Sequence, residues 1–211
     1  MSAKPPALLP NHPFWSFSCQ VYEKTKDHLL GLQTRYNLNI NMLLFCLWFA
    51  ANNHSSLTKQ DLKHLLTSIH TWHERIVAPL RHLRNGLNKN TLLTPTWVES
   101  VREEVLATEL TAEHIEELLI IDAAPKKGQR NRRTLTQRAA FACQNISLYC
   151  QVLYIYPDEA DCQCLADILI VIFAELNPED ALALCRAVLM GKHLPNNKAT
   201  QKQLQLELLI S

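Results

Sequence analysis

Two arginines one helical turn apart are the residues of this sequence best suited to bind a ligand. Arg81 and Arg84 lie three positions apart, so their side chains share one face of a helix. Guanidinium groups bind carboxylate or phosphate through paired N–H donors. One hypothesis is therefore that the chain is a binding protein or an enzyme for a small anionic ligand. Asn41 and Trp72 would complete the site.

The favoured interpretation of the same arginines is structural. A strongly acidic segment lies downstream, and antiparallel packing would bring Glu103, Glu104 or Glu109 close to the two arginines. An ion-pair network of this kind fixes two helices against each other. Arginines saturated by glutamate cannot also bind a ligand, so the pairing decides between the two hypotheses.

A basic segment at 125–133 is the strongest nucleic-acid signal. It carries no hydrophobic anchor, which predicts a linker, and solvation is its favoured role. Its cations can neutralise phosphates, so binding to nucleic acid or the ribosome is the second alternative. No aromatic residue is interleaved for base stacking. The five cations are Lys126, Lys127, Arg130, Arg132 and Arg133.

Motifs for metal binding or catalysis are weak or absent. His70 and His73 are one turn apart, but the metalloprotease pattern around them is missing, and a hydrogen-bonded core histidine is favoured. Cys162-x-Cys164 lacks a second cysteine pair. No phosphate loop or nucleophile elbow occurs. We predict no catalytic residue, no metal and no cofactor. The tryptophans are interpreted as core residues: Trp15, Trp48, Trp72 and Trp97.

The segment 39–51 must be the centre of the fold. After Ile40 its only polar residue is Asn41, so a helix here is apolar on every face and buried all round. It is shorter than the about 20 residues that cross a bilayer. Asn39 is the predicted N-cap. Asn41 must find hydrogen-bond partners, either in the neighbouring backbone or in a ligand.

Two further helices carry seven-residue repeats. Leu62, Ile69, Ile76 and Leu83 recur every seven residues, and a second helix with similar rows opens at Thr94-Pro95. Such rows, joined by a short polar connection, predict an antiparallel helix pair. Proline interrupts a helical hydrogen-bond ladder, so the first helix should kink before Pro79. Nearer the N-terminus, one helix should start at Pro13 and a second should span about 27–36.

Composition is that of a folded, all-helical protein. Of the 211 residues, 47% are hydrophobic, 19% are charged and only 4 are glycine, and the net charge is +1. We predict an all-α, single-domain helical bundle at 13–191, a flexible lead-in at 1–12, and a polar loop with a weakly attached helix at 192–211. The 7 cysteines and the absence of a signal-peptide pattern favour the cytoplasm, with no membrane contact.

Several motifs occur along the chain: Phe14-Trp15-x-Phe17 with Tyr22, the stretch 41–50, Trp72, Pro79-Leu80-Arg81 with Arg84, 109–113, and Asn145 with Tyr149. In order and spacing they resemble a proteobacterial family catalogued as domain of unknown function 2390. The resemblance covers about 14–190; it departs at 52–54, where the usual glycine is missing, and beyond Gly191. It implies a helical, cytoplasmic bacterial protein and no assigned reaction.

The leading functional prediction is a non-catalytic interaction or adaptor protein. A patterned core, charged faces of opposite sign and the missing catalytic motifs together favour binding to an unidentified protein partner. The anionic-ligand and nucleic-acid hypotheses remain the alternatives.

Overall fold

The computed structural model describes residues 9–52, 56–87, 94–126 and 133–191, and the regular elements in these ranges are all helical. The all-α prediction is confirmed. The chain forms two compact units. The hairpin unit comprises Met1–Ser16 and His64–Ala124, and the core unit comprises Phe17–Lys63 and Pro125–Ser211. The predicted C-terminal helix and most of the lead-in lie outside the described residues.

The first helix, α1, spans Pro13–Tyr36 and begins at the predicted proline. The separate helix expected from about residue 27 is instead its second half, because the chain kinks without leaving the helix. Thr25 has φ −129° and ψ 17° at this point. Its Oγ1 donates a hydrogen bond to the carbonyl of Val21 at 2.7 Å, a local bond that commonly bends helices.

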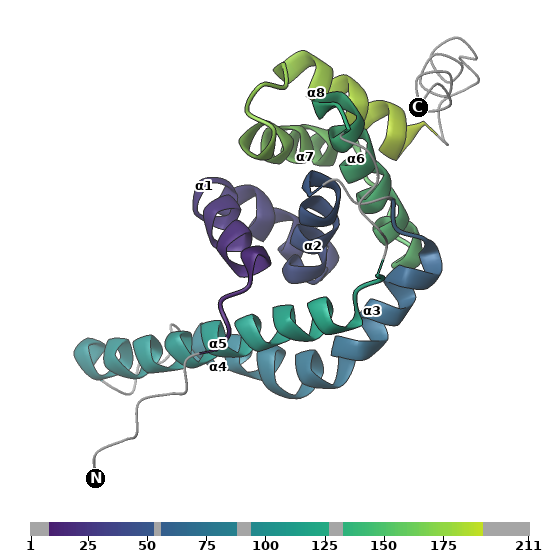
Figure 1. The fold of residues 1–211 in the computed structure, drawn as a ribbon. Coiled ribbons are helices and arrows are strands. Elements are labelled where there is room, and N and C mark those ends of the chain that lie inside the picture. Colours follow the sequence, from purple (N-terminus) through teal and green to yellow (C-terminus); the bar gives the residue numbers. More distant parts are fainter. Residues whose placement is uncertain (1–8, 53–55, 88–93, 127–132, 192–211) are drawn as a thin grey trace. The chain divides into compact units, whose positions relative to one another are not determined.

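Helix α2, Ile40–Ala51, is the centre of the core unit, as its composition predicts. Nearly all of its residues are buried, and it lies against α6, Leu135–Val152 (Figure 1). Asn39 caps it as predicted: its Oδ1 accepts from the N–H of Met42 at 3.0 Å.

Two side chains of α6 hold the chain on either side of α2. Asn145, fully buried, accepts from the N–H of Leu57 at 2.9 Å and donates to the carbonyl of Cys46 at 3.1 Å. Tyr149, one turn later, bonds the backbone of Asn39. Asn145 therefore ties the middle of α2 to the segment that leads into α3, and Tyr149 holds the residue that caps α2.

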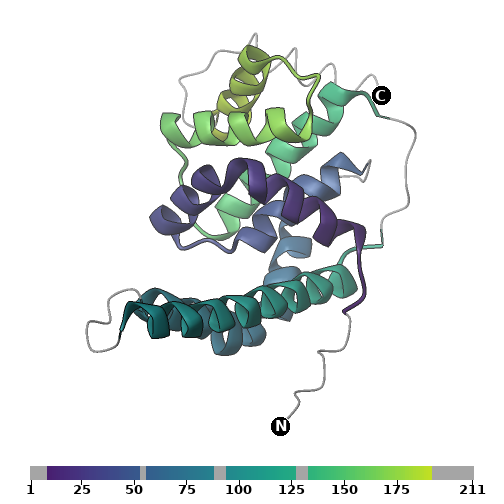
Figure 2. The same cartoon turned by 90° about the vertical axis from the view of Figure 1, so that its left-hand side faces the viewer.

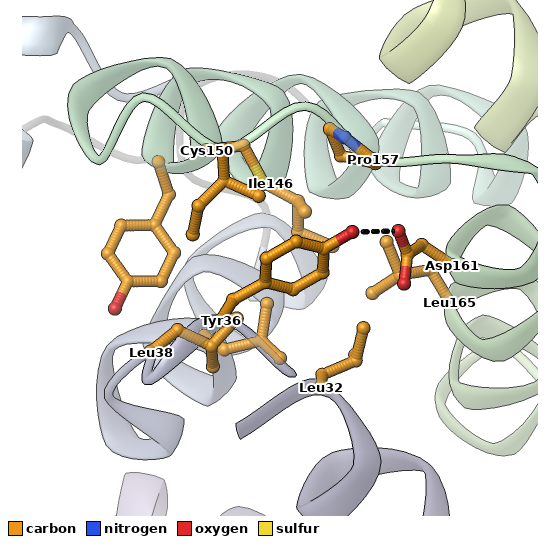
Figure 3. Close-up of a pocket in the computed structure, with 11 residues that line it drawn as sticks. Leu32, Tyr36, Leu38, Ile146, Cys150, Pro157, Asp161 and Leu165 are labelled. Carbon is orange, nitrogen blue, oxygen red and sulfur yellow. Dashed lines mark hydrogen bonds between the residues drawn. The ribbon is translucent and has the colours of Figure 1, made fainter. Parts of the chain in front are cut away.

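The core unit is completed by α7, Glu159–Ile172, and α8, Pro178–Cys185, which continues into the π-helical turn η2, Arg186–Met190. The end of α1 is tied to the start of α7, because Tyr36 donates to the buried carboxylate of Asp161 at 2.5 Å (Figure 3). The cavity beside this bond offers only about 10 Å³ to the centre of a water molecule. That is room for one water, not for a metabolite.

The hairpin unit is built from a long interrupted helix and its antiparallel neighbour. Helix α3, Lys59–Trp72, passes through a π-helical turn, η1, His73–Val77, into α4, Ala78–Leu87. The irregularity predicted before Pro79 is therefore a widened turn, in which the N–H of Ala78 bonds the carbonyl of His73.

Helix α5, Pro95–Ala123, runs beside this helix in the opposite direction (Figure 2). The predicted antiparallel pair is present. The seven-residue row of the long interrupted helix is only partly buried, however. Leu62 and Ile69 lie in the core, whereas Ile76 is 37% and Leu83 is 50% exposed. From Ile76, within the π turn, onward the apolar row therefore faces solvent.

Candidate functional site

The two arginines of α4 form ion pairs with α5. Arg84 places its Nε 2.5 Å from Oε2 of Glu109, and its second donor reaches the other carboxylate oxygen at 3.2 Å. Arg81 donates through Nε to the same Glu109 at 3.2 Å and through Nη2 to Glu113 at 2.6 Å. Glu109 is 3% exposed and thus holds two guanidinium groups in a nearly dry setting.

These contacts match the structural interpretation of the arginines: of the three predicted glutamates Glu109 takes part, and Glu113 is an additional partner. Glu103 and Glu104 are exposed, and Glu109 and Glu113 take the positions opposite the arginines. Burial raises the pKa of Glu113, while Arg81 opposes the rise. Both guanidinium groups thus already pair with carboxylates of the protein itself.

Trp72 and His73 extend the same seam toward the end of α5. The indole N–H of Trp72 donates to the carbonyl of Ala112 at 2.9 Å. His73 Nδ1 lies 2.8 Å from Oε1 of Glu116, whose side chain is 1% exposed. Both residues act here as packing groups with satisfied polar atoms. In the described ranges no group of three or more His, Cys, Asp or Glu side chains is arranged to hold a metal ion.

The remaining predicted ligand residue, Asn41, is a residue of the core unit. It lies in the first turn of α2 with 9% of its surface exposed. The contacts of the arginine seam are made without it. The structure thus brings together Trp72, Arg81 and Arg84 along one helix pair, and it places Asn41 in the packing of another unit.

Only the ends of the basic linker are described. Lys126 is exposed, and the guanidinium carbon of Arg133 lies 4.0 Å above the ring centre of Phe141 in a cation–π contact. Lys127, Arg130 and Arg132 lie outside the described residues. Nucleic-acid binding by this segment stays a prediction.

Sequence reasoning missed a group of exposed apolar side chains on the hairpin unit. Trp97, interpreted from the sequence as a core residue, is 65% exposed, and Val101, one turn later, is 44% exposed. Half-buried Val105 continues their row. On the opposing helix the exposed Ile76 and Leu83 form a row with two half-buried leucines. We call the two rows together the apolar stripe: Ile76, Leu80, Leu83, Leu87, Trp97, Val101 and Val105.

Both rows of the apolar stripe lie on the same side of the hairpin. Each residue of an α-helix is rotated by about 100° from the one before it. Arg81 and Arg84 each come one residue after a leucine of the apolar row, so their side chains are rotated about 100° around α4 from that row. Glu109 and Glu113 follow the row of α5 by a similar angle. Because the helices run in opposite directions and their charged sides meet, these equal offsets turn the two rows to one side. The four-residue spacing of Trp97, Val101 and Val105 was the available sequence signal.

No helix in the described ranges is long and apolar enough to cross a membrane.

The comparisons with known proteins identify a family and nothing finer. No match was found among curated proteins or among solved structures. The family model described as "Protein of unknown function (DUF2390)" matches residues 13–119, which include α1 to α4 and most of α5. The chain therefore belongs to the DUF2390 family of proteins of unknown function.

Proposed function

We propose that this chain is a non-catalytic interaction protein of the bacterial cytoplasm, and that the apolar stripe is its contact surface. The observation that carries the proposal is the exposure of large apolar side chains on one side of the hairpin unit. Ile76, Leu83, Trp97 and Val101, all members of the apolar stripe, are each at least 37% exposed. Contiguous apolar surface of this kind is typical of protein-binding sites.

The polar groups of the hairpin unit support binding rather than catalysis. Arg81 and Arg84 are ion-paired, and the indole N–H of Trp72 is hydrogen-bonded to the backbone. The seam therefore fixes the two helices rigidly and leaves their apolar side for a partner. An anion site at these arginines would require Glu109 or Glu113 to leave them.

The cysteines support a reducing compartment. All seven keep their thiols, including buried pairs close enough to interact, such as Cys143 and Cys185 with sulfurs 3.9 Å apart. Burial raises the pKa of the Cys150 thiol to about 12, so this thiol stays protonated and unreactive at neutral pH.

The experiment is affinity capture from native lysate with three forms of the full chain. The test variant carries Leu83→Glu and Val101→Glu; the control carries Leu110→Glu. Leu110 is a matched control because it is 45% exposed, like Val101 at 44%, and lies nine residues away on the opposite face of α5. We expect a discrete protein to co-purify with the wild type and the control and to be lost with the test variant.

Two results would contradict the proposal. One is equal capture by all three forms, which would place the contact elsewhere. The other is turnover of a metabolite by the purified chain, which would make it an enzyme.

A further inference from the structure

The hairpin unit, which carries the apolar stripe, has more acidic than basic side chains. The described residues of the hairpin unit between 64 and 124 include nine acidic and four basic side chains. The acidic ones are Glu74, Glu99, Glu103, Glu104, Glu109, Glu113, Glu116, Glu117 and Asp122; the basic ones are Arg75, Arg81, Arg84 and Arg102.

The arginines of this unit are mostly neutralised within it. Arg81 and Arg84 pair with the buried seam, and Arg102 pairs with Glu99 at 2.6 Å. Exposed Glu104 lies one turn after Ser100 on the side of α5 that carries Trp97, at the edge of the stripe. These ion pairs neutralise the glutamates as well as the arginines, so the unit keeps a net negative charge, and Glu104 places one carboxylate beside the apolar side chains.

This negative charge limits the kinds of partner that can bind to the apolar stripe. A second copy of the chain would bring the same acidic helices against each other, and like charges across an interface cost several kcal/mol in typical cases. Nucleic acid and an anionic lipid surface carry the same sign as the hairpin and are repelled. A positively charged surface with an apolar strip is the complementary one.

The stripe also has the dimensions of a helix-binding face. From Ile76 to Leu87 the row rises about 16 Å, which equals three turns of a partner helix. Apolar residues on two neighbouring helices of net negative charge match the binding mode in which an amphipathic helix lies along a helix pair. We propose that the apolar stripe binds a basic amphipathic helix of a partner protein; this rests on the proposed function and names the chemistry of its partner.

The test uses two labelled model peptides of about 18 residues, long enough for five turns. Both carry leucine at helical positions i, i+3, i+4 and i+7; one has lysine and the other glutamate on the flanks. Fluorescence anisotropy measures the binding of each to the full-length wild type. The same titration is run on Leu83→Ser with Val101→Ser, on Leu110→Ser, and on Glu103→Gln with Glu104→Gln.

We expect the lysine peptide to bind at least about tenfold more tightly than the glutamate peptide. Its affinity should fall about tenfold or more in the serine pair, because two apolar anchors are removed without a change in charge. It should fall less in the glutamine pair, and it should be unchanged in Leu110→Ser. Circular dichroism of each variant confirms that the fold is retained.

Other outcomes overturn the inference in distinguishable ways. Equal binding of both peptides, lost in the serine pair, would refute a basic partner and leave the proposed function standing. If neither peptide binds while capture from lysate still depends on the apolar stripe, the basic partner is likewise refuted and the proposed function stands. Concentration-dependent dimerisation that the serine pair abolishes would assign the stripe to a second copy. Failure of both capture and peptide binding would refute the proposed function itself.

Discussion

The hydroxyl of Tyr149 accepts a hydrogen bond from the N–H of Asn39 at 3.1 Å and donates one to the carbonyl of the same residue at 3.2 Å. One side chain of α6 therefore satisfies both backbone groups of the residue that caps α2. Tyr149 is 1% exposed, so water cannot replace these bonds if they are lost.

Replacing Tyr149 by phenylalanine should lower the free energy of unfolding by about 1 to 2 kcal/mol, because two buried hydrogen bonds to the backbone of Asn39 are lost. Urea denaturation followed by circular dichroism measures the change. Tyr154, which is 83% exposed, is the matched control. Tyr154→Phe should change stability by less than about 0.5 kcal/mol. Equal effects at the two positions would argue against the role of the Tyr149 hydroxyl.

Asn145 has a similar role with two different partners, and its variants can separate them. Asn145→Asp keeps an acceptor for the N–H of Leu57 and loses the donor to the carbonyl of Cys46. Asn145→Leu loses both. We expect both to destabilise the core unit, by about 2 to 4 kcal/mol for the leucine variant. A leucine variant as stable as the wild type would show that the buried amide contributes nothing.

The ion-paired seam predicts unequal effects for two chemically identical substitutions. Glu109→Gln leaves Arg81 and Arg84 without their shared anion and should cost about 1 to 3 kcal/mol. Glu99→Gln removes only the exposed pair with Arg102 and should cost much less, because solvent screens that pair. Thermal unfolding of the two variants under the same conditions measures the difference. Similar costs would mean that burial of Glu109 does not strengthen its ion pairs.

His114 should make the hairpin unit sensitive to acid. It stacks on Trp15 with ring centres 4.3 Å apart, and burial lowers its pKa from the ordinary value of 6.5. A lowered pKa means that the unfolded chain binds the proton first. The stability that neutral His114 contributes is therefore complete above pH 6.5 and is lost as the pH falls through the lower folded-state value.

The measurement compares the wild type with His114→Phe from about pH 8 to about pH 5. The free-energy difference between them should be constant in the upper part of this range. It should move against the wild type in the lower part, because only the wild type takes up this proton. A difference that stays constant throughout would show that His114 does not titrate differently on folding.

Local signals in the sequence were sufficient for much of the fold. The cap at Asn39 depends on a side chain three residues from the N–H group that it bonds, so it can be recognised without tertiary information. The continuous apolar run of α2 likewise permits only a buried helix. These features predicted the centre of the core unit correctly.

The hairpin unit shows what such signals cannot provide. A seven-residue repeat identifies an apolar side but not whether another element covers it, so the exposure of Ile76 and Leu83 could not be predicted. Acidic side chains are normally exposed, and the burial of Glu109, Glu116 and Glu117 depends on partners or packing from other parts of the chain. The sequence predicted that the arginines form ion pairs with the acidic helix. Which glutamates pair with them depends on the register of the two helices, which only the structure provides.

The central claim is that the apolar stripe contacts a protein in the cell. The most direct measurement places a photo-crosslinking phenylalanine analogue at Val101 in one strain and at Leu110 in another, followed by irradiation and immunoblotting. The account predicts a discrete crosslinked product of higher mass from position 101 and none of that mass from position 110. The same product from both positions, or none from either, would contradict it.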